Sequence, residues 1–283
     1  MSTSRVIYVP QGSISKIISH MQKSGFSVSG FDSYILRFLG SPQHGWIDIK
    51  ATRLSKGDFL HKLTTSKAAL TSITIIPGDT LYITIQNLSN ILGLNEDALF
   101  RAYNKYAPFP DGVIVPETYN IPVGISANHL MYYLVNTSIN SHKKLSKKIL
   151  GEYDKNQWFK YLTIASIIEK EAANEQEMPL VSAVIYNRLK KGMPLQMDGA
   201  LNYGKFSNQK VTAKRLRSDN SQFNTYKNRG LPSYPVCAVS IDAIKAAINP
   251  ANVDYLYFVK GKDGKHNFSK SYNQHLYNIR NGK

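Results

Sequence analysis

The segment from Trp158 to about Ala173 constrains the fold more than any other part of the sequence. Apolar side chains occupy most of its positions, and few polar residues separate them. A helix that is apolar around most of its circumference is stable only where other elements cover it. We therefore predict a helix near the centre of a packed core, and a chain of 283 residues is long enough to build such a core.

This helix ends in a charged triplet, Glu169-Lys170-Glu171. At about 100° per residue, the two glutamates flank opposite edges of the apolar arc, and Lys170 points away. Partial desolvation and the negative potential of the helix C-terminus both raise the pKa of a carboxyl group, as a general acid requires. The helical wheel places Glu169 slightly further inward than Glu171. The alternative interpretation is that both glutamates lie on the surface beyond the core and pair with Lys170 or Arg188.

The remaining pattern predicts an α+β fold with short strands. Strand–turn–helix units are expected at 6–21, 46–63 and 73–92, and the turn Ile-Pro-Gly-Asp-Thr-Leu at 76–81 resembles LysM-type glycan-binding modules. Loops are expected at 106–126 and irregular structure at 193–235, because Pro, Gly, Asn and Ser are frequent there. Further helices are predicted at 127–150, 180–191 and 240–248, and strands at 255–259 and 266–268.

The charge balance limits the classes of ligand. Thirty-five Lys and Arg against 19 Asp and Glu give a net charge of 35 − 19 = +16. Such a surface attracts polyanions, whether nucleic acid, anionic lipid or a carboxylate-bearing polymer such as the bacterial cell wall. A basic protein that binds nucleic acid would use residues such as Lys205, Lys210, Lys214, Arg215 and Arg217. Because the basic residues are scattered along the chain, we do not expect nucleic acid as a partner.

The sequence offers little for a metal or cofactor. Cys237 is the single cysteine, so an internal disulfide and a Cys-based zinc site are excluded. The seven histidines show no His-x-x-x-His spacing, and no Gly-rich phosphate loop or Gly-x-Ser-x-Gly motif is present. We therefore expect neither a metal nor an organic cofactor. No apolar run approaches the ~20 residues that a membrane-spanning helix needs, and no signal peptide is visible.

An ordered series of motifs resembles the endolytic murein transglycosylases of the YceG-like (MltG) family. The series runs through most of the chain, which makes it more specific than any single motif. Its members are Pro116-Glu117-Thr118-Tyr119, Leu162 to Glu171, Val184-Ile185-Tyr186-Asn187-Arg188-Leu189, Gly192 to Asp198, Phe223-Asn224-Thr225-Tyr226, Gly230-Leu231-Pro232, Ala246 to Pro250, Tyr255 to Val259 and His266-Asn267-Phe268.

The resemblance implies both an architecture and a location. The family has a short cytoplasmic tail, one membrane span, a LysM-like subdomain and a catalytic domain. We accordingly expect a LysM-like subdomain at 1–71 and a catalytic domain at 72–283. The resemblance also implies an N-terminal anchor in the inner membrane that this chain lacks, a catalytic domain in the periplasm, and cell-wall synthases and the division and elongation complexes as partners.

The resemblance further implies a reaction and its residues. The β-1,4 bond between N-acetylmuramic acid and N-acetylglucosamine would be split by Glu171, acting first as acid and then as base, with a 1,6-anhydro sugar as product. We weigh the family position above the helical wheel, so Glu169 is the second choice. The expected substrate-contacting residues are Gln196, Asp198, Asn224, Thr225, Tyr226, Asn187 and Glu117. Their alternative role is loop structure, since Asn and Thr stabilise turns.

The sequence departs from the family pattern near the expected site. The family's Gln-Thr-Asp-Pro-Thr reads Gln196-Met197-Asp198-Gly199-Ala200 here, and its Tyr-Asn-Thr-Tyr begins with Phe223. Two other functions stay open: a glycoside hydrolase that pairs Glu171 with Glu117 or Asp198, and the basic polyanion-binding protein described above.

Overall fold

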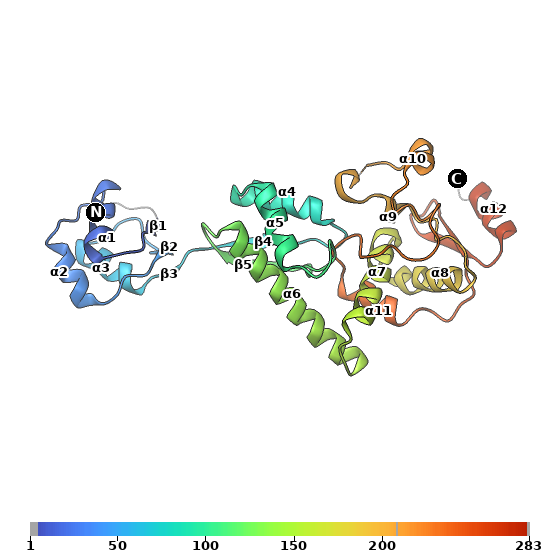
Figure 1. Ribbon diagram of the computed structural model, residues 1–283, viewed down its shortest axis with the longest axis horizontal. Helices are drawn as coiled ribbons and strands as arrows, with labels where there is room; N and C mark the ends of the chain where they lie inside the picture. Colours follow the sequence, from blue (N-terminus) through green and yellow to red (C-terminus); the bar gives the residue numbers. More distant parts are fainter. Residues whose placement is uncertain (1–4, 208, 282–283) are drawn as a thin grey trace. The chain divides into compact units, whose positions relative to one another are not determined.

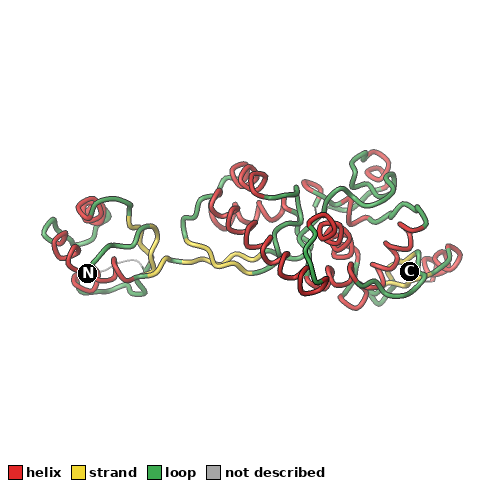
Figure 2. Tube along the Cα trace, turned by 60° about the horizontal axis from the view of Figure 1, so that its bottom comes forward, coloured by secondary structure: helices red, strands yellow, loops and turns green. Residues whose placement is uncertain are grey.

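The computed structural model describes residues 5–207 and 209–281 (Figure 1). The chain divides into two compact units, each of which is described by itself. Unit 1 takes in residues up to Ile73 together with Thr118–Ser126, and unit 2 contains Thr74–Glu117 and the chain from Ala127 onward. The small sheets and many helices in Figure 2 confirm the predicted α+β class.

Unit 1 is built on a three-stranded antiparallel sheet in the order β1-β2-β3. Strand β1 spans Val6–Val9, β2 spans Gly45–Asp48 and β3 spans Lys67–Ala68. Val6 lies opposite Asp48, and Asp48 lies opposite Lys67 on its other side. The helices of this unit are α1 (Ile14–Lys23), α2 (Asp32–Leu39) and α3 (Lys56–Thr65).

The core of unit 1 follows from helix capping and apolar spacing. The hydroxyls of Ser13 and Ser55 accept hydrogen bonds from backbone N–H groups in the first turns of α1 and α3, which fixes where both helices begin. From these starting points the helices direct one apolar stripe each against the sheet. The buried cluster contains Ile7, Val9, Ile17, Ile18, Met21, Leu36, Ile47, Ile49, Phe59, Leu60 and Leu63.

Strands β4 (Leu70–Thr74) and β5 (Thr118–Pro122) form a separate two-stranded sheet. The bonds from Ile75 N to Glu117 O and from Val123 N to Ala69 O extend the pairing at its two ends and show that the strands are antiparallel. The turn at 76–81 follows β4, outside the range 1–71. The assignment of 1–71 to a LysM-like subdomain and of 72–283 to a catalytic domain stays a prediction.

Unit 2 is mostly helical. Its long helices are α4 (Leu81–Leu92), α5 (Glu96–Tyr106), α6 (Ala127–Leu150), α7 (Lys155–Glu171), α8 (Met178–Lys190), α11 (Ile241–Ile248) and α12 (Tyr272–Asn281). Shorter segments are the 3₁₀ helices η1 (Glu175–Glu177) and η2 (Gly204–Phe206) and the helices α9 (Asp198–Leu201) and α10 (Ala213–Ser218). Strands β6 (Tyr257–Lys260) and β7 (His266–Ser269) form an antiparallel hairpin.

Helix α7 occupies the centre of unit 2, as its composition predicts. It packs against α8, α9 and α11, and nine consecutive or nearly consecutive side chains from Trp158 to Ile168 are buried. Because its neighbours surround it, the position and direction of its last turn are set by the packing of the whole unit. The charged triplet therefore leaves the core at a defined place.

The structure adds elements that the sequence pattern did not predict. Helices α9, η2 and α10 lie in the segment expected to be irregular, and β5 lies in the segment expected to be loop. These elements are three to six residues long, which is too short to show a periodicity in the sequence. Helix α2 escaped prediction for another reason: its aromatic side chains at Tyr34 and Phe38 face outward and are exposed, so its apolar pattern does not mark a buried face.

None of the helices in the described residues is long and apolar enough to cross a membrane.

Candidate active site

Glu171 is the last residue of α7 and reaches a pocket in unit 2. The helix begins where the Asp154 side chain accepts a hydrogen bond from the N–H of Gln157, and it ends where the N–H of Ala172 bonds to the carbonyl of Ile168. The apolar residues between these points fix the helix in the core. As a result, the backbone that carries the Glu171 side chain has a fixed position beside the pocket.

The carboxyl group of Glu171 contacts the first turn of α9. The N–H of Gly199 donates a hydrogen bond to its Oε1 at 2.6 Å. A Cβ atom on Gly199 would lie 2.9 Å from this oxygen and 2.5 Å from the Cβ of Lys170. Only glycine therefore allows this approach.

The surroundings of Glu171 favour its protonated form. Burial raises its pKa from 4.5 to about 7, and the negative charge of Asp198 acts in the same direction, whereas the Gly199 N–H opposes the shift. The residue as a whole is only partly covered, because it opens onto the pocket, but its carboxyl is enclosed by α9 and the core. A carboxyl with a pKa near neutrality can both give and take a proton at physiological pH.

The pocket beside Glu171 has a volume of about 380 Å³. It is formed by the end of α7, helix α8, the segment before α9, strand β6 and helix α12. Its lining residues are Glu171, Arg188, Leu195, Gln196, Asp198, Tyr226, Tyr257, Phe258, Val259, Tyr272, His275 and Ile279. A wall with both aromatic and hydrogen-bonding groups suits a sugar, which offers apolar ring faces and hydroxyl groups.

Arg188 of α8 holds two walls of this pocket together. It is 7% exposed. Its Nε donates to the carbonyl of Leu256 at 2.7 Å, and its Nη1 donates to the carbonyl of Leu195 at 2.7 Å and to the Gln196 Oε1 at 3.3 Å. Its guanidinium also lies 5.3 Å from the centre of the Tyr257 ring. Arg188 thus supplies positive charge to the pocket while fixing the loop that precedes α9.

That loop has an unusual backbone at Gln196, where φ is +52°. Left-handed backbone is costly for a residue with a side chain and persists where the surroundings impose it. Here the N–H of Gln196 bonds to the carbonyl of Thr225 at 3.0 Å, and the Thr225 hydroxyl accepts from the N–H of Met197 at 2.8 Å. The strained turn directs the Gln196 side chain into the pocket wall.

Asp198 and Tyr226 form a pair in the same wall. The Tyr226 hydroxyl donates a hydrogen bond to Asp198 Oδ1 at 2.7 Å. Burial, together with this bond to a carboxylate, raises the pKa of Tyr226 above its ordinary value. The tyrosine therefore stays protonated and holds Asp198 close enough to influence Glu171.

The three residues of the charged triplet have different partners. Glu169 Oε2 accepts from the N–H of Ser240 at 2.9 Å and from its hydroxyl at 2.7 Å, at the start of α11. Lys170 donates from Nζ to the carbonyl of Gly78 at 2.9 Å. Glu169 thus stabilises a helix N-terminus, and Glu171 is the glutamate that lines the pocket.

The structure brings four of the predicted site residues together at one pocket: Glu171, Gln196, Asp198 and Tyr226. The others lie elsewhere or point elsewhere. Asn187 donates to the carbonyls of Val253 and Tyr255. Asn224 donates to the carbonyls of Leu216 and Asp219, and Thr225 bonds to Met197 as described. Glu117 is exposed and is absent from the lining of this pocket.

Sequence reasoning missed the contributions of Arg188, Tyr257 and His275 to the pocket. The sequence places Arg188 in the Val184–Leu189 motif and offers it as a partner for a glutamate, but it indicates no role for Arg188 in the pocket. Tyr257 stacks on His275 with ring centres 5.2 Å apart, and these residues lie on β6 and α12, far from α7 in sequence. A pairing of this kind depends on tertiary structure, and no local pattern indicates it.

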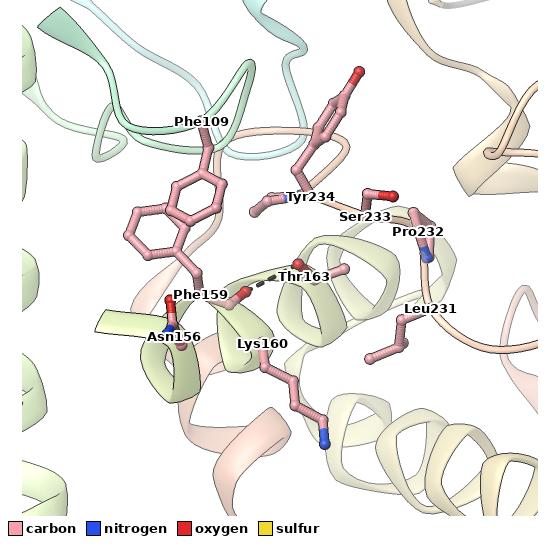
Figure 3. A pocket seen from close by; sticks show the side chains of 10 residues that line it. Phe109, Asn156, Phe159, Lys160, Thr163, Leu231, Pro232, Ser233 and Tyr234 are labelled. Carbon is pink, nitrogen blue, oxygen red and sulfur yellow. Dashed lines mark hydrogen bonds between the residues drawn. The ribbon is translucent and has the colours of Figure 1, made fainter. Parts of the chain in front are cut away.

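A second pocket, of about 270 Å³, lies beside the N-terminal half of α7 (Figure 3). The rings of Phe109 and Phe159 stack there with centres 3.8 Å apart, and Leu231 and Pro232 of the Gly230-Leu231-Pro232 motif line the opposite side. None of the described residues that line it carries a carboxyl group. It offers an apolar surface but no acid.

The residues that the structure describes contain no group of three or more His, Cys, Asp or Glu side chains placed to hold a metal ion.

Comparison with known proteins agrees with the arrangement of these motifs. The model of the YceG-like family matches residues 7–281, so the chain belongs to the YceG-like family. A crystal structure of a yceG-like protein from Listeria monocytogenes is similar to the chain with a TM-score of 0.62 and 26% sequence identity. That match covers 98% of this chain and 99% of the other.

Two curated relatives carry the name endolytic murein transglycosylase. The protein from Bacillus subtilis (strain 168) is 35% identical over 181 residues, which are 61% of this chain and 48% of that protein. The protein from Streptococcus pneumoniae serotype 2 (strain D39 / NCTC 7466) is 34% identical over 176 residues, 60% of this chain and 31% of that protein. The match thus spans half or less of the length of these relatives.

Proposed function

We propose that the protein is an endolytic murein transglycosylase that cleaves the β-1,4 bond between N-acetylmuramic acid and N-acetylglucosamine in peptidoglycan. The carrying observation is the Glu171 carboxyl in a pocket of about 380 Å³ with its pKa raised by burial to about 7. The names of the relatives support the substrate class. The chemistry of the pocket supports a proton transfer at a sugar.

In the proposed reaction one carboxyl group serves twice. Protonated Glu171 gives its proton to the glycosidic oxygen as the bond from that oxygen to the muramyl anomeric carbon breaks. The resulting carboxylate takes the proton of the muramyl C6 hydroxyl, whose oxygen bonds to the anomeric carbon. The products are a 1,6-anhydromuramyl end and a free hydroxyl on the other sugar, and no water is consumed. An internal nucleophile carries a large proximity advantage.

The other residues of the pocket have supporting roles in this proposal. Positive charge develops on the sugar ring as the bond breaks, and the Asp198 carboxylate, held by the Tyr226 hydroxyl at 2.7 Å, stabilises it. Gln196 offers an amide to sugar hydroxyl or acetamido groups. Asn187, Asn224 and Thr225 act through the loops that they hold, because their polar atoms bond to the backbone.

A two-carboxylate hydrolase is the second candidate, and one observation favours it: Asp198 lines the same pocket as Glu171. In that reaction Asp198 would act as nucleophile or activate a water molecule. Glu117, the other predicted partner, is exposed and does not line the pocket. The hydrolase alternative therefore reduces to the pair Glu171 and Asp198.

The two reactions yield products of different mass. Purified glycan strands are incubated with the protein, and the new muramic acid ends are measured by mass spectrometry. The proposal expects anhydro ends, lighter by one water than the reducing ends that hydrolysis leaves. In Asp198→Asn, the proposal expects anhydro ends at a reduced rate. Reducing ends made by the unaltered protein and lost in Asp198→Asn would establish the hydrolase instead.

The proposed substrate also defines where the protein acts. Peptidoglycan lies outside the cytoplasmic membrane, so we propose that both units face that side, with attachment to the membrane and contact with cell-wall synthases and the division and elongation complexes. Protease added to intact spheroplasts tests the location: digestion of the protein supports it, and protection until lysis contradicts it.

A further inference from the structure

Unit 1 contains a pocket that the proposed reaction does not use. Its volume is about 400 Å³. It forms where β2 ends, where β3 begins beside it and where the last turn of α3 reaches the sheet. The residues that line it are Asp48, Lys50, Lys62, Thr65, Ser66, Lys67, Ala68 and Leu70.

Three lysines from different elements line this pocket. Lys50 follows β2, Lys62 belongs to the last turn of α3, and Lys67 opens β3. Within the described chain, none of their ammonium groups has a carboxylate oxygen within ion-pair distance. Three lysines against one carboxylate give the lining of this pocket a positive potential, and a bound anion reduces the repulsion between the lysines.

The carboxylate in the wall is already neutralised. Asp48 accepts hydrogen bonds at 3.2 Å from both Nε and Nη2 of Arg5. The Arg5 side chain holds the pKa of Asp48 below its usual value, and the backbone N–H and the positive charge of Lys50 act in the same direction. The lysines therefore dominate the charge that a ligand would meet.

Ser66 lines the same pocket, and its hydroxyl group is buried in the pocket wall. The residue is 8% exposed, and its Oγ is buried without a hydrogen-bond partner among the described residues. A buried hydroxyl without a partner costs free energy, and such exceptions call for an explanation. An oxygen-rich ligand would supply the missing partner once the Ser66 hydroxyl rotates toward the pocket.

Lys50 has a strained backbone. Its φ is +55°, and its N–H donates to Asp48 Oδ1 at 2.9 Å. Glycine would adopt this conformation without cost, whereas lysine does not. With this backbone conformation, Lys50 lines the pocket immediately after strand β2 ends. Strained residues cluster at binding and catalytic sites, where the side chain has a task.

We propose that this lysine pocket binds a phosphoryl group. Lysine binds phosphate as a point charge, and a phosphate monoester offers three oxygens and up to two negative charges to several lysines, whereas a carboxylate offers two oxygens and one charge. Lys50, Lys62 and Lys67 belong to three separate segments of the pocket wall, so a group with several oxygens can pair with more than one of them. The volume leaves room for the group that carries the phosphate. This inference does not depend on glycan cleavage.

Titration of the full chain with glycerol phosphate tests the proposal. The amide signals of Ser66 and Lys67 are followed by NMR at constant ionic strength, with sodium glutamate as the carboxylate comparator. We expect saturable shifts with glycerol phosphate and weaker ones with glutamate. The double variant Lys62→Gln/Lys67→Gln should weaken binding by about tenfold or more, because charged hydrogen bonds are lost.

Two further variants separate a site from general charge attraction. Lys16→Gln/Lys23→Gln removes two exposed lysines of α1 that do not line the pocket, and it should leave the affinity within about twofold. Ser66→Ala changes no charge and should weaken binding severalfold without loss of folding. The proposal is overturned if no saturable shift occurs, if glutamate binds as tightly, or if the α1 variant loses as much affinity as the pocket variant.

Vesicles identify the source of the phosphoryl group. Phosphatidylglycerol vesicles are compared with phosphatidylcholine vesicles in a flotation assay, alongside the soluble glycerol phosphate titration. Flotation with phosphatidylglycerol that disappears in Lys62→Gln/Lys67→Gln assigns the site to a lipid headgroup. Saturable binding of glycerol phosphate without flotation assigns it to a soluble or polymeric phosphate. Both results support a phosphoryl site.

Discussion

The Glu171 pocket of unit 2 and the lysine pocket of unit 1 share a backbone feature and differ in charge. Each contains one non-glycine residue with positive φ, Gln196 at +52° and Lys50 at +55°, and these are the two such residues in the described part of the chain. Strain of this kind costs on the order of 1–3 kcal/mol per residue. Each pocket thus contains one strained residue. We interpret the strain as the cost in stability of placing the side chains of Gln196 and Lys50 in their pockets.

The difference lies in how each pocket treats its charges. In unit 2 the carboxyl group of Glu171 is enclosed, and its burial raises its pKa to about 7, so that it holds its proton up to that pH. In unit 1 Lys50 and Lys67 are exposed, and among the described residues no carboxylate oxygen lies within ion-pair distance of the three lysines of the pocket. An enclosed acid is suited to transfer a proton, and an open group of cations is suited to attract an anion. The two pockets thus point to chemistry in one unit and binding in the other.

The largest expected effect is the loss of glycan cleavage in Glu171→Gln. The substitution keeps the shape and the bond from Gly199 but removes the proton, and general acid–base catalysis contributes about 10²–10⁴-fold in rate. Release of anhydro ends from purified glycan strands is the measurement. Glu169→Gln is the matched control, since it removes a neighbouring acid that bonds to Ser240. If Glu171→Gln were active and Glu169→Gln inactive, Glu169 and not Glu171 would be the catalytic acid.

Arg188→Lys should destabilise the fold strongly. Lysine cannot reach the carbonyls of Leu256 and Leu195 together, so at least one buried acceptor loses its charged donor. We expect the free energy of unfolding to fall by about 2–4 kcal/mol. Denaturant unfolding of this variant is compared with that of Arg101→Lys on the exposed face of α5. Equal stability of the two variants would show that Arg188 does not hold the pocket walls together.

Glu171→Gln should also change how stability depends on pH. The folded chain holds the Glu171 proton more tightly than the unfolded chain between pH 4.5 and about 7. The free energy of unfolding therefore falls as the pH rises through this window, and glutamine escapes the fall. Above the window we expect the variant to be more stable by on the order of 1–3 kcal/mol, the lower end reflecting the opening to the pocket.

Thermal midpoints across the pH range measure this effect. Glu175→Gln, an exposed glutamate on η1, serves as the control for the loss of one negative charge. Below pH 4.5 Glu171→Gln and the unaltered chain should have similar stability. A constant difference at all pH values would mean that packing, and not protonation, separates them.

The sequence predicted the long helices and the position of Glu171 better than the roles of the other residues around the pocket. Helix α7 and the position of Glu171 follow from apolar periodicity and the family motif, and α4 and α6 begin and end as predicted. The roles of Asn187 and Asn224 could not be predicted, because an asparagine that binds a backbone carbonyl and one that binds a ligand look alike in sequence. Arg188 reaches the pocket only because α8 packs beside α7.

The lysine pocket had no signal in the sequence at all. Lys50, Lys62 and Lys67 show no motif, and a net charge of +16 makes any three lysines unremarkable. They line one pocket because β3 pairs with β2 immediately after α3 ends, so that Lys67 lies opposite Asp48. Register between strands depends on the whole unit. The left-handed backbone at Lys50 is equally invisible, since the usual indicator of such a turn is glycine.

The smallest expected effect compares the two strained residues directly. In Lys50→Gly and Gln196→Gly the left-handed backbone no longer strains a side chain, although glycine gains freedom in the unfolded chain. We expect each variant to match or exceed the unaltered chain in stability, by about 0.5 kcal/mol at most. The functional costs should be separate: Lys50→Gly weakens glycerol phosphate binding and leaves glycan cleavage intact, and Gln196→Gly slows cleavage and leaves phosphate binding intact. Denaturant unfolding, glycerol phosphate binding and glycan cleavage are measured on the same samples of each variant.

Loss of both functions in either variant would mean that the two pockets are not independent. A marked loss of stability would mean that the side chain stabilises the turn rather than serving a ligand.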